Sequence, residues 1–198
     1  MANGLSYANV ESQSVFQRCL HEHAAILNVL GEIEPQVEAA ARIILKSARQ
    51  GKTILLAGNG GSASDAQHIA GEFVGRYLLE RKGASAIALG ASDANLTSIG
   101  NDYGFDQVFA RQVEAYRSHA GALIAYSTSG NSANILAAIG MANKWGIPVI
   151  GLSGESGGAM KRVCDVCICV PSGATPRIQE MHALIGHVLC EMVEPSLE

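Results

Sequence analysis

An imidazole and a carboxylate stand four residues apart in this sequence, at His68 and Glu72. In a helix, this spacing places both side chains on one face. The pair supplies the groups that general acid–base catalysis requires, and also a nitrogen and an oxygen donor of the kind that bind zinc. Gln179 and His187 complete the candidate set, but their separation of eight residues corresponds to about 12 Å of helix. Both can reach one metal ion only if the helix starts late or bends, or if subunits share the site.

The helix that carries the His–Glu pair is expected to follow a glycine-rich turn. An apolar run at 53–57 predicts a buried strand, which leads into Gly58-Asn59-Gly60-Gly61-Ser62. Ser62 or Ser64 is expected to cap the helix. A strand, a glycine turn and a helix N-terminus together form a site for an anion, because backbone N–H groups and the helix dipole attract negative charge.

Two other interpretations of the glycine turn stay open. It could be a tight turn without a ligand. The spacing Gly58-x-Gly60-x-x-Ala63 also matches the pattern of dinucleotide-binding sites. That pattern expects an acidic residue at the end of the second strand, whereas Asp93 comes late, so a nucleotide cofactor is not expected.

A run of hydroxyl side chains follows the third expected strand. Four hydroxyls, together with the backbone N–H groups of a helix terminus, can surround a phosphate without a lysine or an arginine. The sequence therefore predicts a phosphate-monoester site at Ser127, Thr128, Ser129 and Ser132.

These groups need a scaffold in which strands and helices alternate. Hydrophobic patterning predicts five strands, at 53–57, 84–89, 122–126, 149–152 and 166–170. Helices are expected at 14–30, 34–50, from 62 onward, at 106–116, 133–145 and 175–193, with a short helix or turn at 92–99 and a turn at 100–104. This alternation is typical of an α/β fold, a three-layer αβα sandwich around a five-stranded parallel sheet, and such sheets bind ligands at the carboxyl ends of their strands.

Length and composition limit the possible functions. The 198 residues fit one domain, with a helical N-terminal region at 1–50 and an α/β core at 51–198. The net charge is −4 and no basic run occurs, which argues against nucleic acid or a membrane surface as a partner. No apolar stretch is long enough for a membrane span and no signal pattern opens the chain, so the cytoplasm is the expected location.

The five cysteines include a cluster, Cys164-x-x-Cys167-x-Cys169. Because this cluster lies in an apolar run that predicts a buried strand, we expect reduced thiols that pack as small hydrophobic groups. The alternative is a zinc site.

Four motifs, in this order and spacing, resemble the phosphoheptose isomerases of the sugar-isomerase (SIS) domain family, which has a flavodoxin-like sheet. They are AGNGGSASDAQHIAGEF, IGNDYGF, YSTSGNSANIL and RIQEMHALIGH. The resemblance extends from about residue 35 to the C-terminus. It implies a cytoplasmic homotetramer that converts sedoheptulose 7-phosphate to D-glycero-D-manno-heptose 7-phosphate, the first step of ADP-heptose synthesis for lipopolysaccharide or a related heptose pathway.

The same resemblance assigns roles to individual residues. Glu72 would be the base that moves a proton between C1 and C2 through an enediol, and His187 would be its acid–base partner. The zinc ligands, with one ion per subunit, would be His68, Glu72, Gln179 and His187. Sugar phosphate would be held by Asn59, Gly60, Gly61, Ser62, Glu72, Asn101, Asp102, Ser127, Thr128, Ser129, Ser132 and Gln179.

Isomerisation of this kind needs no redox cofactor. A zinc ligand is less free to act as a base, so zinc bound by Glu72 would be stabilising or partly inhibitory rather than catalytic. Asp65 also matches an acidic position near the family's site.

A rival function belongs to another class of protein. A relative with the same fold binds the bacterial replication initiator, and the segment RIQEMH fits that regulator equally well. The helix after the glycine turn discriminates between the two, because an isomerase needs His68 and Glu72 together whereas a binding protein has no chemical reason to keep Glu72.

Overall fold

A five-stranded, entirely parallel sheet organises the computed structural model, which describes residues 14–197. The order of the strands across the sheet is β2-β1-β3-β4-β5. Their bounds are β1 Thr53–Ala57, β2 Ala86–Ala88, β3 Ala120–Tyr126, β4 Val149–Ser153 and β5 Val166–Cys169. Residues 1–13 of the expected N-terminal region, and Glu198, lie outside the described residues.

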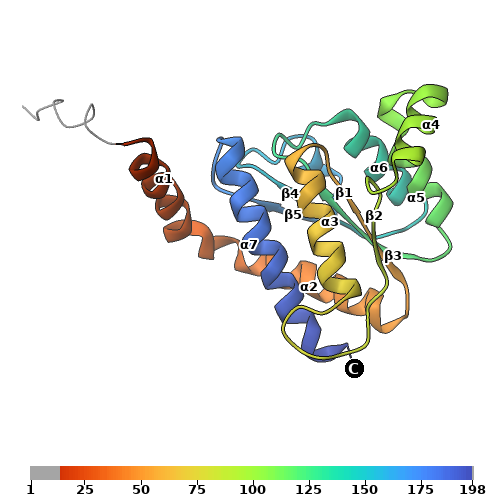
Figure 1. The fold of residues 1–198 in the computed structure, drawn as a ribbon, viewed down its shortest axis with the longest axis horizontal. Helices are drawn as coiled ribbons and strands as arrows, with labels where there is room; N and C mark the ends of the chain where they lie inside the picture. Colours follow the sequence, from red (N-terminus) through yellow and green to blue (C-terminus); the bar gives the residue numbers. More distant parts are fainter. Residues whose placement is uncertain (1–13, 198) are drawn as a thin grey trace, which may run out of the picture.

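Helices cover both faces of this sheet, which confirms the expected three-layer α/β fold (Figure 1). One face carries α2 (Glu34–Arg49), α3 (Gly61–Val74) and α7 (Thr175–Val193). The other face carries α4 (Asp93–Tyr103), α5 (Ala110–Tyr116) and α6 (Ala133–Lys144). A further helix, α1 (Val15–Leu30), leads away from the sheet in Figure 1. Short 3-10 turns at 31–33, 105–107, 160–162 and 194–196 complete the elements.

Alternation along β1 divides the interior into two cores. Ile54 and Leu56 face the α2–α3–α7 side, whereas Leu55 and Ala57 face the α4–α5–α6 side, and all four side chains are fully buried. A strand buried on both faces has to be apolar throughout, which is why this segment is a continuous hydrophobic run. Full burial of one such leucine or isoleucine contributes about 1.5–3 kcal/mol.

Three elements differ clearly in extent from the sequence prediction, and β3 also begins two residues early, at Ala120. Strand β2 spans three residues rather than 84–89, and as an edge strand it pairs only with β1. Helix α4 continues through the predicted turn at 100–104 as far as Tyr103 and ends at Gly104, whose φ of +87° leaves the helical region. The predicted helix at 106–116 is divided into a 3-10 turn and α5.

The predicted serine cap of α3 is wrong. Gly60 occupies the cap position with φ +54°, a conformation that favours glycine, and no side chain caps the helix. Ser62 lies inside the first turn and is buried. Gly58 is required for a different reason, because a Cβ there would lie 2.3 Å from the backbone oxygen of Ser62.

Helices α3 and α7 run side by side in the same direction (Figure 1). Near their starts, Gly61 lies against the Gln179 side chain, and a Cβ on Gly61 would approach the amide nitrogen to 2.5 Å. Farther along, a Cβ on Gly186 would lie 2.6 Å from Cδ1 of Ile69. The two helices therefore approach each other more closely than larger residues would allow.

The segment that follows α3 is anchored to the C-terminal end of α7. The buried carboxylate of Glu194 accepts hydrogen bonds from the backbone N–H groups of Tyr77, Leu78 and Leu79, at 2.7–2.9 Å. Its Oε1 atom also lies 3.2 Å from Nε of Arg81. Loss of water raises the pKa of Glu194, but these N–H groups and the guanidinium outweigh that effect and lower it overall.

Candidate active site

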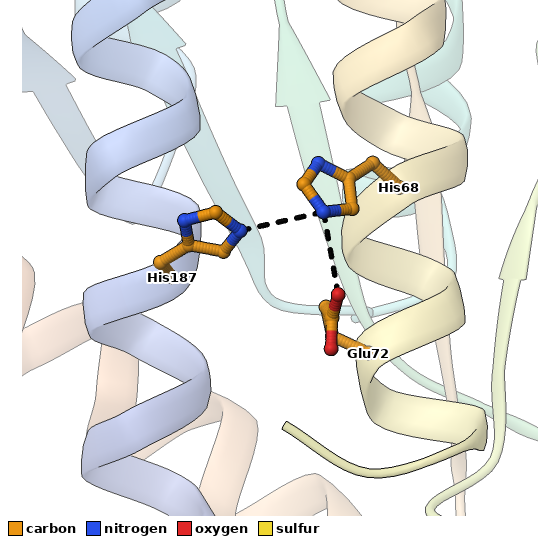
Figure 2. A group of neighbouring side chains, drawn as sticks. All are labelled: His68, Glu72 and His187. Carbon is orange, nitrogen blue, oxygen red and sulfur yellow. Dashed lines mark hydrogen bonds and ion pairs between the residues drawn. The ribbon is translucent and has the colours of Figure 1, made fainter. Parts of the chain in front are cut away.

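Three of the predicted residues meet where α3 faces α7. His68 and Glu72 lie one turn apart on α3, with His68 Nε2 3.3 Å from Glu72 Oε1. From α7, His187 places its Nε2 atom 3.3 Å from His68 Nε2, and the two rings meet edge to face (Figure 2). The pairing of His68 with Glu72 follows from the helical spacing, whereas the approach of His187 is tertiary and depends on its neighbour Gly186.

Two residues that the sequence analysis missed support this cluster. Tyr77 stacks on the ring of His187, with the ring centroids 5.3 Å apart. Arg81 donates a hydrogen bond of 2.8 Å to the backbone oxygen of Glu72. Both belong to the segment that Glu194 anchors, so a carboxylate distant in sequence helps to position the site.

The donor set fits a divalent metal ion. One ligand atom from each of His68, Glu72 and His187 can be chosen so that all three lie within 4.8 Å of one another. Two imidazole nitrogens and a carboxylate oxygen are the ligands of many zinc sites.

Gln179, the fourth predicted ligand, lies where α3 and α7 begin, before the level of His68. It contacts Gly61 at the start of α3, seven residues before His68. The long spacing between Gln179 and His187 noted in the sequence is therefore kept within one chain, and the four-ligand site stays a prediction.

The glycine turn at 58–62 and the loop at 127–132, here called the hydroxyl loop, lie together because each follows one of two neighbouring strands, β1 and β3. Asn59 Nδ2 donates to Asn134 Oδ1 and Asn134 Nδ2 donates back to Asn59 Oδ1, each at 2.8 Å. Asn134 was also missed by the sequence analysis, since an asparagine in the first turn of a helix carries no pattern that predicts a distant partner. Ser127 Oγ and Ser132 Oγ lie 2.9 Å apart across the base of the hydroxyl loop.

A polar cavity of about 320 Å³ opens beside this loop. Of the predicted phosphate residues, Thr128 and Ser129 line it, and Glu155 is the one charged residue along its wall. The N-terminus of α7 borders the cavity through Thr175, and a helix N-terminus favours an anion. Further hydroxyl groups of the lining come from Ser156 and Ser172.

Asn101 and Asp102 lie apart from the groups described so far. They occupy the exposed last turn of α4, where Asn101 Nδ2 donates to Asp102 Oδ1 at 2.8 Å. Neither belongs to the His68–Glu72–His187 cluster or lines the polar cavity. Their role in binding sugar phosphate stays a prediction.

Three further polar groups have pKa values shifted by burial. Burial raises the pKa of Asp65, and the nearby charge of His68 counteracts this effect. Burial likewise raises the pKa of Tyr126, assisted by the negative charge of Asp65. Burial lowers the pKa of His182 to about 4, so this histidine, packed edge-on against Tyr126, is neutral and part of the core.

Similarity to known proteins agrees with this geometry. Residues 20–154 match the SIS domain family. A phosphoheptose isomerase of Rhodospirillum rubrum is 51% identical over 168 residues, which cover 85% of this chain and 89% of the relative. Another, from Aliarcobacter butzleri, is 46% identical and covers 93% of this chain and 97% of the relative.

Solved structures agree as well. A phosphoheptose isomerase structure from Neisseria gonorrhoeae superposes with a TM-score of 0.82 at 38% identity, covering 92% of this chain and all of that chain. One from Francisella tularensis gives a TM-score of 0.85 at 32% identity, with the same coverage. Sheet, helix pair and sequence thus lead to one conclusion: the chain belongs to the SIS domain family and, within it, to the phosphoheptose isomerases.

Proposed function

We propose that this protein interconverts sedoheptulose 7-phosphate and D-glycero-D-manno-heptose 7-phosphate in the cytoplasm, as the first step of ADP-heptose biosynthesis. The observation that carries the proposal is the cluster of His68, Glu72 and His187 between α3 and α7. Among residues 14–197, no helix is long and apolar enough to span a membrane.

The reaction needs one group to remove a proton from carbon and another to serve the adjacent oxygen. Glu72 is the proposed base, which carries the proton between C1 and C2 through an enediol. His187 is the proposed acid–base partner, held by its stacking on Tyr77. The two residues come from separate helices that meet at the cluster, so a sugar bound against the cluster would meet both a base and an acid.

Zinc is the proposed metal, with one ion per subunit. His68, Glu72 and His187 would hold it, joined by Gln179 if its side chain reaches the same ion. When bound, zinc would act as a Lewis acid that stabilises negative charge on the enediolate oxygens. Glu72 then has two proposed roles, and each reduces its freedom for the other.

The phosphate and hydroxyl groups of the sugar need donors away from the reacting carbons. We assign the phosphate to the hydroxyl loop, with Ser127, Thr128, Ser129 and Ser132 as donors. The polar cavity and the N-terminus of α7 support this assignment. The proposed contacts with the rest of the sugar are Asn59, Gly60, Gly61, Ser62, Glu72, Asn101, Asp102 and Gln179.

The initiator-binding regulator remains the second candidate, since it shares the fold. The assembled cluster argues against it, because a purely structural helix pair has no need for two facing imidazoles and a carboxylate.

Replacing Glu72 tests the proposed base. Glu72→Gln keeps the shape of the side chain but removes its basicity, so we expect kcat for sedoheptulose 7-phosphate to fall by about 10²–10⁴-fold with little change in KM. Glu80→Gln is the matched control, because Glu80 is an exposed carboxylate beyond the end of α3. A coupled assay of heptose 7-phosphate formation measures both variants. Near-normal turnover by Glu72→Gln would contradict the assigned mechanism.

Zinc binding can be measured without reference to turnover. His187→Gln removes one of the three clustered donors, so its affinity for zinc should fall by roughly 100-fold or more, because even the loss of an outer-shell partner costs 10–100-fold. His119→Gln replaces an exposed histidine remote in sequence from the cluster and should leave the affinity unchanged. Elemental analysis after dialysis against buffered zinc gives the stoichiometry. Equal zinc content in the wild type and His187→Gln would exclude the proposed site.

We further propose that the protein is a homotetramer. Phe16 and Leu20 on α1 are 70% and 52% exposed. An apolar groove of about 430 Å³ lies between the α1–α2 junction and α7, where Leu184 and Val188 are also exposed. Apolar surface of this extent is typical of an interface between subunits.

A charge on α1 tests this assembly. Phe16→Glu would bury a carboxylate in the proposed interface, so sedimentation equilibrium should show species smaller than the wild-type tetramer. Its exposed neighbour provides the control, Gln17→Glu, which should remain tetrameric. A monomeric wild type, or a tetramer unaffected by Phe16→Glu, would overturn the proposal.

A further inference from the structure

Three thiols gather at the β5 edge of the sheet, away from the proposed active site. Cys167 and Cys169 lie on β5, and Cys164 lies in the segment just before it. Cys169 Sγ donates to Cys167 Sγ at 3.8 Å, and the sulfurs of Cys164 and Cys167 both lie over Gly151. All three are free and partly exposed. They face the α4–α5–α6 side, whereas the histidine cluster lies on the other side of the sheet.

Gly151, which has no side chain, makes room for two of these sulfurs. Cys167 pairs with Gly151 in the register of β4 and β5. A Cβ on Gly151 would lie 2.9 Å from Cys164 Sγ and 3.4 Å from Cys167 Sγ. Gly151 therefore leaves one space on the sheet, and two thiols share it.

The surroundings distinguish the two thiols chemically. A hydrogen bond from Cys164 lowers the pKa of Cys167 to about 6; burial opposes this shift, and Ser153, Cys169 and the charge of Lys161 add to it. The same hydrogen bond and burial raise the pKa of Cys164. Cys167 is therefore the more acidic thiol of the pair, and Cys164 keeps its proton to higher pH. A thiolate next to a second thiol is the arrangement of reactive cysteine pairs.

We propose that Cys164 and Cys167 form a redox pair that closes to a disulfide when the protein reacts with hydrogen peroxide. The Cys167 thiolate attacks one peroxide oxygen, the O–O bond breaks, hydroxide leaves and Cys167 becomes a sulfenic acid. The Cys164 sulfur then attacks Cys167 sulfur, an S–S bond forms, the S–O bond breaks, and the Cys164 proton leaves with the hydroxyl group as water. The two thiols lose two electrons in total, and the peroxide gains them.

Strand geometry favours Cys164 over Cys169 as the partner. Residues two apart on a strand have Cα atoms about 6.6 Å apart, near the upper limit for a disulfide, whose usual Cα separation is about 5.5–6 Å. Cys164 precedes β5, and its Sγ lies over the same glycine, Gly151, as Cys167 Sγ. This inference is independent of the proposed isomerase activity.

Asp165 makes the linkage measurable, because it separates Cys164 from the other two thiols in the sequence. The full-length protein is treated with hydrogen peroxide, free thiols are alkylated, and trypsin releases residues 163–177. Cleavage on the N-terminal side of Asp165 then leaves two pieces. A Cys164–Cys167 disulfide holds these pieces together until a reductant is added, whereas a Cys167–Cys169 disulfide lies within one piece.

We expect linked pieces from the wild type and also from Cys169→Ser. Cys164→Ser should stop at the sulfenic acid of Cys167, which dimedone traps. Cys19 on α1 is also free and partly exposed, and should be oxidised at least about 10-fold more slowly than Cys167. Separate pieces from the peroxide-treated wild type, a Cys167–Cys169 linkage, or faster oxidation of Cys19 would each overturn the proposal. If Cys164→Ser does not fold, the wild type and Cys169→Ser still decide.

Discussion

The close approach of α3 and α7 is the constraint on which the proposed active site depends. At Gly186 the two helices come so near that a methyl group would meet Ile69. The next residue along α7, His187, consequently reaches His68 across the interface. The parallel sheet supports this geometry, because both helices pack on the same face through Ile69, Ile185 and their neighbours. A packing requirement and a chemical requirement are thus met at adjacent positions of one helix.

Polar pairs fix the segments around this interface. Glu194 accepts hydrogen bonds from three backbone N–H groups and pairs with the Arg81 guanidinium. It thereby anchors the segment that contains Tyr77, whose ring stacks on His187. The reciprocal amides of Asn59 and Asn134 join the loops that follow β1 and β3. The carboxylate of Glu194 and the two asparagine amides all have partners, which favours one arrangement of these loops. Catalytic groups need this rigidity, because small displacements cost large factors in rate.

The features that the sequence could predict are those that depend on local pattern. The apolar run at 53–57 and the spacing of His68 and Glu72 depend on neighbours in the chain, and both were interpreted correctly. His187 was a candidate from the sequence, but its spacing of about 12 Å from Gln179 left its place in the site open, and only the resemblance to a family gave it a role. Tyr77, Arg81, Asn134 and Glu194 were missed, because each acts through a partner distant in sequence. The serine cap of α3 was wrong, because a glycine with positive φ took its place. Whether Gln179 joins the metal ligands stays a prediction, because the spacing along α7 does not decide it.

The central claim is that a base on α3 and an acid on α7 move a proton between neighbouring carbons of a sugar phosphate. NMR of sedoheptulose 7-phosphate turnover in D₂O tests it most directly. A base that exchanges its proton with solvent delivers deuterium to the product. We therefore expect heptose 7-phosphate labelled at C2. Product without the label would contradict a solvent-exchanging base and indicate a shielded proton or a hydride shift. Binding without any product would contradict the isomerase itself and favour the regulator.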